Sequence, residues 1–273
     1  MSSTGAGYDY APTIYSPDGR IFQVEYAQKA IDSGGTSIGV KCKDGVVLAN
    51  EKLLFSKMLV DSSNRAHFGL DLHCGMVTSG ILPDGRQLAL RARSVAKQFK
   101  GAYALPIIPQ QLADQMGQFI HAYTCYYQFR PFGASFIFAG YDATNKEAEL
   151  YGVDSAGNAL RYFGHSVGKG ARAAKTEIER MKFSDKTCRE ALKDLAKIIE
   201  IVHDDVKDKP YLLEMSWVCE ETGMKWAMVK PEDALAARKA AMDEIAAEDE
   251  ESDEDDSDDD DDEDDSDDDE DEE

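Results

Sequence analysis

The stretch that decides the fold runs from residue 15 to residue 30 and reads Tyr-Ser-Pro-Asp-Gly-Arg-Ile-Phe-Gln-Val-Glu-Tyr-Ala-Gln-Lys-Ala. Ser16 can cap free backbone N–H groups, and Pro17 suits the first position of a helix. Asp18 would complement the positive end of the helix dipole. The pattern therefore predicts a helix that begins near Pro17.

The predicted helix is apolar on more than one side. Phe22 and Tyr26 form one ridge, and a second ridge lies beside it at helical spacing. We expect one ridge to pack on the body of this chain and the other to contact a partner protein. The second ridge consists of Ile21, Val24, Ala27, Gln28 and Ile31.

Two runs within this stretch, Ser-Pro-Asp-Gly-Arg at 16–20 and Gln-Val-Glu-Tyr-Ala at 23–27, resemble the signature of proteasome alpha subunits. The resemblance covers about residues 5–245. Within the family, the acidic C-terminal stretch and residues 203–209 resemble the member that occupies the seventh alpha position of the ring. Further matching motifs are Lys-Asp-Gly-Val-Val at 43–47, Thr-Ser-Gly at 78–80, Arg-Pro-Phe-Gly at 130–133, Gly-Tyr-Asp at 140–142, Gly-Lys at 168–169 and Ala-Lys-Thr-Glu-Ile-Glu at 174–179.

Strand patterns and amphipathic helix patterns alternate in pairs along the chain. Such an order indicates two antiparallel sheets face to face with helices on both outer faces, although another α+β arrangement also fits. The resemblance implies the four-layer αββα sandwich of amino-terminal-nucleophile hydrolases. The predicted elements are a hairpin at 36–50, strands at 73–79, 134–141, 148–153 and 158–163, helices from Pro83 and Pro109 and at 171–181 and 186–204, a hairpin at 211–229 and a helix from Pro231.

Composition excludes several classes of protein. Apolar residues make up 42% of the 273 positions, which is enough for one large domain, and no run approaches 18 apolar residues. The five cysteines are widely spaced, which predicts reduced core thiols, and the five histidines form no metal-ligand pattern. We expect a protein of the cytoplasm and nucleus that needs no cofactor and no metal.

The net charge of −23 is concentrated at the C-terminus. Residues 248–273 hold 23 of the 53 acidic residues and no base, so 30 acidic residues remain against 30 Lys and Arg. The sequence predicts an N-terminal arm at 1–15, a neutral folded domain at 16–247 and a disordered acidic tail at 248–273. A neutral body also argues against direct binding of nucleic acid. Candidate phosphorylation sites for an acid-directed kinase are Ser252, Ser257 and Ser266.

Two glycine motifs suggest chemistry that their context does not support. Residues 35–39 match Gly-x-Ser-x-Gly of esterases, but no strand is predicted before the serine and no helix after it. Residues 168–173 match Gly-x-Gly-x-x-Ala of dinucleotide-binding folds, but the neighbouring strands predict an antiparallel meander. We interpret the first motif as a bend that enters the hairpin and the second as a helix start packed closely on a sheet.

The family's beta subunits cleave peptides with an N-terminal threonine, whose free amine serves as the base. Alignment on the first hairpin places Gly35 at that position and Thr36 one step later, with 34 residues before Gly35. Glu51 stands near the position of the aspartate in the beta subunits, and Asn-Arg-Ala-His at 64–67 replaces the region of the lysine. The resemblance therefore implies a non-catalytic relative.

The resemblance also implies roles in assembly and gating. Six other alpha subunits and the beta ring are the expected partners, with a regulatory particle or other activators at the outer face and no membrane. Tyr8, Asp9 and Pro17 match the family's gating residues, whereas Tyr10 stands where the family has an arginine. The alternative is an acidic-tailed chaperone of histones or other basic proteins, which native mass would distinguish from a large particle.

Overall fold

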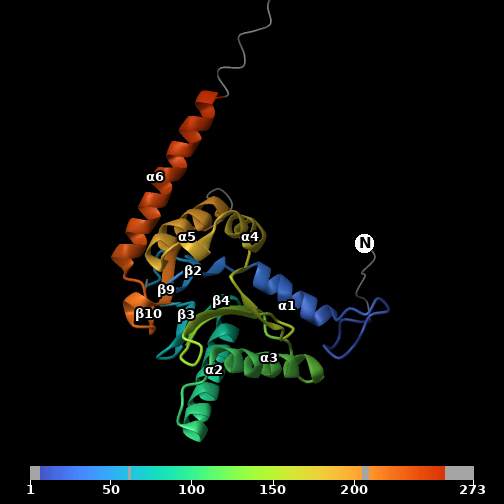
Figure 1. Cartoon of the computed structure of the whole chain (residues 1–273). Helices are drawn as coiled ribbons and strands as arrows, with labels where there is room; N and C mark the ends of the chain where they lie inside the picture. The colour runs from blue at the N-terminus through green and yellow to red at the C-terminus, as the bar shows by residue number, and fades with distance from the viewer. Residues whose placement is uncertain (1–6, 61–62, 205–208, 256–273) are drawn as a thin grey trace, which may run out of the picture.

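The computed structural model describes residues 7–60, 63–204 and 209–255, with side chains up to Glu248, as two stacked β-sheets with helices outside them (Figure 1). Each sheet has five strands, and every paired strand is antiparallel. The first sheet has the order β10 (Trp226–Met228), β9 (Tyr211–Cys219), β2 (Gly45–Leu53), β1 (Ser37–Lys41), β8 (Gly164–Val167). The second has the order β3 (His67–Asp71), β4 (Cys74–Gly80), β5 (Ala134–Asp142), β6 (Glu147–Val153), β7 (Ala159–Tyr162).

Each sheet carries a helix pair on its outer face (Figure 1). Helices α2 (Leu82–Tyr103) and α3 (Pro109–Cys125) cover the second sheet, and α4 (Ala171–Arg180) and α5 (Cys188–Val202) cover the first. Helix α5 begins with a capping box in which the side chains of Thr187 and Glu190 bond each other's backbone N–H groups. The arrangement confirms the predicted αββα sandwich.

Three apolar clusters match the three boundaries between the layers. The cluster between the sheets includes Leu48, Ile137 and Leu150, all fully buried. A second joins the first sheet to α4 and α5, and a third joins the other sheet to α2 and α3. Each of the two sheets has an apolar cluster on both of its faces. Strands β2 and β5 are therefore buried along nearly their whole length.

Helix α1 (Phe22–Asp32) begins later than the sequence pattern predicts, and the start at Pro17 is wrong. Ser16 closes a turn instead, because its Oγ accepts from the N–H of Arg20 at 3.0 Å and its N–H donates to the Arg20 carbonyl at 2.9 Å. Gly19 has φ +74, which a right-handed helix cannot contain. The Ser-Pro-Asp-Gly sequence is therefore a turn before the helix.

Two short strands are absent from the sequence-based prediction, and both lie at or near sheet edges. Strands β3 and β8 have five and four residues and show no clear alternation. Helix α6 (Pro231–Asp255) runs through the first residues of the acidic stretch, so this part of the predicted tail is helical. Among the described residues, no helix is long and apolar enough to cross a membrane.

Candidate functional site

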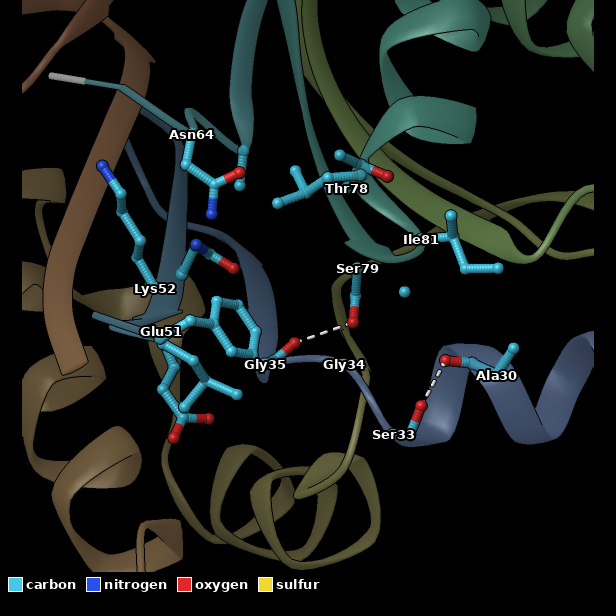
Figure 2. Close-up of a pocket in the computed structure, with 16 residues that line it drawn as sticks. Ala30, Ser33, Gly34, Gly35, Glu51, Lys52, Asn64, Thr78, Ser79 and Ile81 are labelled. Atoms are coloured by element: carbon cyan, nitrogen blue, oxygen red, sulfur yellow. Dashed lines mark hydrogen bonds between the residues drawn. The ribbon is translucent and has the colours of Figure 1, made fainter. Parts of the chain in front are cut away.

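A cavity of about 470 Å³ opens where α1 ends and the two sheets meet (Figure 2). Its walls come from five segments: the end of α1, the linker to β1, the end of β2, the connection from β2 to β3, and the end of β4 with the start of α2. It is lined by Gly35, the residue that the resemblance aligns with the nucleophile of the beta subunits. The lining residues used below are Gly35, Glu51, Lys52, Asn64 and Ser79.

Gly35 and Thr36 form the linker that enters β1. The Thr36 N–H donates to Glu51 Oε2 at 2.9 Å, and the Thr36 hydroxyl accepts from the N–H of Gly170 at 3.1 Å. Ser79 Oγ donates to the Gly35 carbonyl at 2.7 Å (Figure 2). Both hydroxyls therefore support the backbone, and neither is directed at a general base.

The carboxylate and the ammonium group that line the cavity each contact a buried partner. Glu51 Oε1 lies 2.6 Å from His203 Nδ1, and both side chains are almost fully buried. Lys52 Nζ donates to Glu214 Oε1 at 2.9 Å and is also buried. The two contacts fasten β2 to the end of α5 and to β9, so both side chains serve the fold.

His67 lies at the end of the segment in which the beta subunits keep a lysine. Its Nδ1 lies 2.9 Å from Ser216 Oγ, and its Nε2 lies 3.2 Å from the Glu214 carbonyl. Burial lowers the pKa of His67 to about 3, against the opposing effect of the Glu214 carbonyl, and the Lys52 cation lowers it further. The ring is therefore neutral near pH 7 and supplies no positive charge to the cavity.

The two glycine motifs serve packing rather than chemistry. Ser37 lies within β1, and its Oγ donates to Asn50 Oδ1 at 2.8 Å, so the strand-to-helix context of an esterase serine is absent. Gly168 has φ +104, and a side chain at Gly170 would lie 1.9 Å from Val202. Both glycines are required by the close approach of the loop before α4. Among the described residues, no cluster of three or more His, Cys, Asp or Glu could hold a metal ion.

The predicted gating residues precede α1 in the chain, and the structure bonds one of them, Asp9, to the helix. Gln23 of α1 donates a hydrogen bond to the carbonyl of Asp9 and so ties the arm to the helix. Tyr8 and Tyr10 are exposed, and Pro17 sits in the exposed turn before the helix. The arm and the start of α1 therefore form one continuous surface.

Burial along α1 does not follow the two predicted ridges. Phe22, Ala27 and Ile31 are buried, Ile21 and Val24 are half-buried, and Tyr26 is 39% exposed. Phe22 stacks on Tyr26 at 6.2 Å between ring centroids, so the buried and exposed parts are in contact.

Of the tail serines, Ser252 lies in α6, whereas Ser257 and Ser266 lie outside the described residues.

Sequence reasoning missed the partners of the cavity's charged groups. His203, Glu214 and Ser216 are more than 140 positions from the residues they contact. The pairing of β2 with β9 brings Lys52 to Glu214, whereas His203 reaches Glu51 from the end of α5, and His67 reaches Ser216 from β3 in the facing sheet. The only signal in the sequence is that β9 carries polar residues within an otherwise apolar strand.

Comparison with known proteins agrees with this geometry. Residues 31–218 match the family model of proteasome subunits, and residues 8–30 match the model of the N-terminal signature of A-type proteasome subunits. The chain is 46% identical to the alpha type-3 proteasome subunit of Spinacia oleracea, over 91% of this chain and 100% of the relative. It is 49% identical to alpha type-3 of Acanthamoeba castellanii, over 91% and 98% of the two chains.

A third relative is the probable alpha type-7 proteasome subunit of Saccharomyces cerevisiae, at 45% identity over 92% of this chain and 88% of the relative. The names of these relatives confirm the resemblance to alpha type-3 that the sequence indicated. Together the two family models match residues 8–218. The chain therefore belongs to the family of proteasome alpha subunits.

Proposed function

We propose that this chain is a non-catalytic structural and gating subunit of the outer alpha ring of the 20S proteasome core. In that position it controls the entry of substrates for ubiquitin-dependent and ubiquitin-independent degradation in the cytoplasm and nucleus. The observation that carries the proposal is the surface formed by α1 and the arm. This helix packs on its own body through Phe22, Ala27 and Ile31, and it holds the arm through the bond from Gln23 to Asp9.

The exposed side of α1 supports a role in ring assembly. Tyr26 is an exposed aromatic residue, and Val24 is only half-buried beside it. Aromatic side chains give large contact areas at protein interfaces. We infer that neighbouring alpha subunits cover this side, that the beta ring and regulatory particles are further partners, and that alpha subunits are the non-catalytic kind of proteasome subunit.

Deletion of residues 1–9 tests the gating role. The truncated arm loses Tyr8, Asp9 and the anchor to Gln23, but no buried residue of the domain. Purified particles without activator should then hydrolyse a small fluorogenic peptide faster, with a partial effect because other arms share the channel. A matched particle lacking only residues 1–6 keeps the anchor and should remain closer to the intact rate. An unchanged rate after deletion of 1–9 would assign gating to other subunits.

Replacement of Thr36 tests the non-catalytic role. Thr36→Ala removes the hydroxyl that accepts from Gly170 but keeps the N–H that Glu51 binds. Fully assembled particles that carry it should retain each peptide-cleaving activity, as should the control Thr36→Ser. Loss of one activity in the alanine particle alone, with normal assembly, would contradict the proposal.

A further inference from the structure

Cys125 is an exposed cysteine, so the prediction of a core thiol is wrong at this position. It is the last residue of α3 and lies one turn after His121, so the two side chains share a face of the helix. The Cys125 Sγ lies 3.5 Å from His121 Nε2. An accessible thiol therefore contacts an imidazole. The other cysteines, all buried as predicted, are Cys42, Cys74, Cys188 and Cys219.

The ring of His121 is oriented from its other side by the turn between β6 and β7. Its Nδ1 lies 3.3 Å from the Ala156 carbonyl and 3.4 Å from Thr124 Oγ1. A carbonyl oxygen can only accept a hydrogen bond, so Nδ1 carries the proton of the neutral ring. The Thr124 hydroxyl donates to the His121 carbonyl at 2.8 Å and can accept from Nδ1 as well. The unprotonated Nε2 therefore faces the thiol of Cys125 and can accept its proton.

The turn that presents the Ala156 carbonyl is held by one carboxylate. Asp154 Oδ1 accepts from the N–H groups of Ala156 and Asn158, both at 2.9 Å, and Asp154 Oδ2 accepts from Asn158 Nδ2 at 2.8 Å. Gly157 has φ +95, and a Cβ there would lie 2.9 Å from the His121 Cβ. The glycine thus allows the turn to pack directly on α3 beside His121. The acceptor for Nδ1 is therefore a backbone group that the fold fixes in place.

The position of Cys125 at the end of α3 makes the imidazole important for its reactivity. The last turn of a helix carries partial negative charge, which disfavours a thiolate and favours a protonated imidazole. The thiolate, and not the thiol, is the nucleophile. Transfer of the thiol proton to His121 creates an ion pair whose cation lies where the helix dipole favours it. The imidazolium then stabilises the thiolate against the dipole.

We propose that Cys125 is a modification site for small disulfides, with His121 as its general base. His121 Nε2 takes the thiol proton, and the Cys125 thiolate attacks one sulfur of the small disulfide. The original S–S bond breaks as the new one forms, and the departing thiolate takes the proton from His121 to leave as a thiol. One disulfide replaces another, so the step needs no further oxidant. A dithiol reverses the reaction.

Burial of the other cysteines determines the product. All four lie in the described part of the chain and inside the core, so none of them can reach the mixed disulfide at Cys125. The small molecule therefore stays attached and is not displaced by an internal disulfide. The site is independent of the proposed role in the ring, because it uses neither α1 nor the arm.

The test uses the full-length chain, with oxidised glutathione as the probe. Mass spectrometry of the whole protein follows the mixed disulfide with time, and digestion locates the modified cysteine. We expect one glutathione on Cys125, which dithiothreitol removes, and none on the Cys125→Ser chain. Cys125 should react faster in the folded chain than in urea, where His121 is no longer held against the thiol. A first reaction at a buried cysteine, or a rate at Cys125 that does not exceed the rate in urea, would overturn the proposal.

His121→Asn separates the action of a base from simple exposure of the thiol. Asparagine can place an amide donor where Nδ1 lies but has no group at the position of Nε2, so the contact with Ala156 can be kept while the base is lost. The rate at Cys125 should fall about tenfold, which is less than a general base usually contributes, because the pair is exposed.

Gln118→Asn is the matched control, because Gln118 is an exposed residue of the same helix just before His121. Its rate at Cys125 should equal that of the unchanged chain, and in urea all three chains should react alike. Equal rates for the folded His121→Asn and unchanged chains would show that Cys125 has no base, and the proposal would be wrong. If His121→Asn does not fold, the comparison of the unchanged chain with and without urea decides the question.

Discussion

Helices α1 and α6 both lie outside the four layers, but they are attached by different forces (Figure 1). Helix α1 rests on β4 and β5 through Phe22, Ala27 and Ile31. Helix α6 rests on α5. The side chain that it buries completely is the small Ala241, and ion pairs supply further contacts. Apolar burial is insensitive to salt, whereas exposed ion pairs are screened. The ion pairs join Lys193 to Glu244, Lys197 to Glu244 and Glu248, and Arg238 to Glu200.

Substitutions in α1 and in α6 should therefore affect the protein to different extents. A substitution that disrupts α1 exposes apolar surface and disturbs the arm that α1 holds through Gln23. Lys193, Glu244 and Glu248 are exposed by more than a third, so loss of their ion pairs leaves these groups in water and costs little. We therefore expect large, salt-independent effects at α1 and small, salt-dependent effects at α6.

The largest effect should follow Gln28→Pro in α1. Gln28 is exposed, so the change removes no core contact, but an interior proline loses a backbone hydrogen bond and clashes with the preceding turn. The expected cost is about 3 kcal/mol or more in helix stability. On native gels, co-expressed chains should fail to enter full-size particles. A normal yield of particles would contradict the organising role of α1.

Val24→Pro is the matched control, because the structure places Val24 in the first turn of α1. Its N–H bonds to the carbonyl of Ile21, just before the helix, so a proline there loses one weak bond and meets no helical carbonyl one turn earlier. Assembly should be reduced much less than in Gln28→Pro. Equal loss in both variants would mean that the contact made by the Val24 side chain, rather than the helix itself, is critical.

This contrast depends on the one helix boundary that the sequence pattern misplaced. Ser-Pro-Asp-Gly is a good helix start and an equally good turn, and local preferences cannot separate the two. The layers, by contrast, follow from long periodic segments, and α2, α3, α5 and β9 were predictable within a few residues. Long elements carry enough apolar positions to outweigh local ambiguity.

The candidate site could be predicted only in part for a related reason. The absence of a free N-terminal threonine is visible in the sequence, since Thr36 is internal. The contact of Glu51 with His203 depends on the end of α5 lying against β2, and that of Lys52 with Glu214 depends on the pairing of β2 with β9. No local pattern encodes such a partner. The sequence therefore shows that no free N-terminal threonine is present at this position, but it does not show which contacts Glu51 and Lys52 make instead.

The segment around Gly133, against which α1 packs, allows a second, pH-dependent test. Arg130 binds Asp84 through two hydrogen bonds of 2.6 and 2.7 Å, and the Gly133 N–H donates to the same carboxylate at 2.9 Å. Gly133 lies directly against Ala30 of α1. Burial alone would raise the pKa of Asp84, but the bonds from Arg130 and Gly133 outweigh it and lower the pKa.

Because the folded pKa of Asp84 is depressed, its stabilisation is complete above the unfolded value of about 4 and is lost as pH falls through the folded value. Asp84→Asn should therefore lower the free energy of unfolding by about 1–3 kcal/mol near neutral pH. Urea titrations should show the difference from the unchanged chain shrinking in acid. Asp18→Asn, in an exposed turn, is the control and should show no such trend. A difference that stays constant with pH would exclude the ionised carboxylate as its cause.

Helix α6 should respond more weakly. Lys197→Met removes the cation that binds Glu244 and Glu248 but keeps the aliphatic stem that packs on the helix. Both glutamates are substantially exposed, so the loss should be within about 1 kcal/mol at low salt. Amide exchange in α6 should be slightly faster than in the unchanged chain, and the difference should disappear in high salt. A large, salt-independent increase would mean that α6 is held by apolar contacts after all.

The smallest effect on the fold, and a distinct effect on binding, should follow removal of residues 249–273. The cut leaves Glu248 and its ion pair with Lys197, so α6 keeps its anchor. Stability and assembly should be unchanged. The removed segment is almost entirely acidic, and its attraction for basic partners should follow charge density, with a screening length of about 10 Å at 0.1 M salt and about 3 Å at 1 M. Polylysine should therefore bind the truncated chain more weakly at low salt only. A scrambled tail of the same composition should restore most of the binding, and a deletion effect undiminished at about 1 M salt would show that a specific motif is recognised instead.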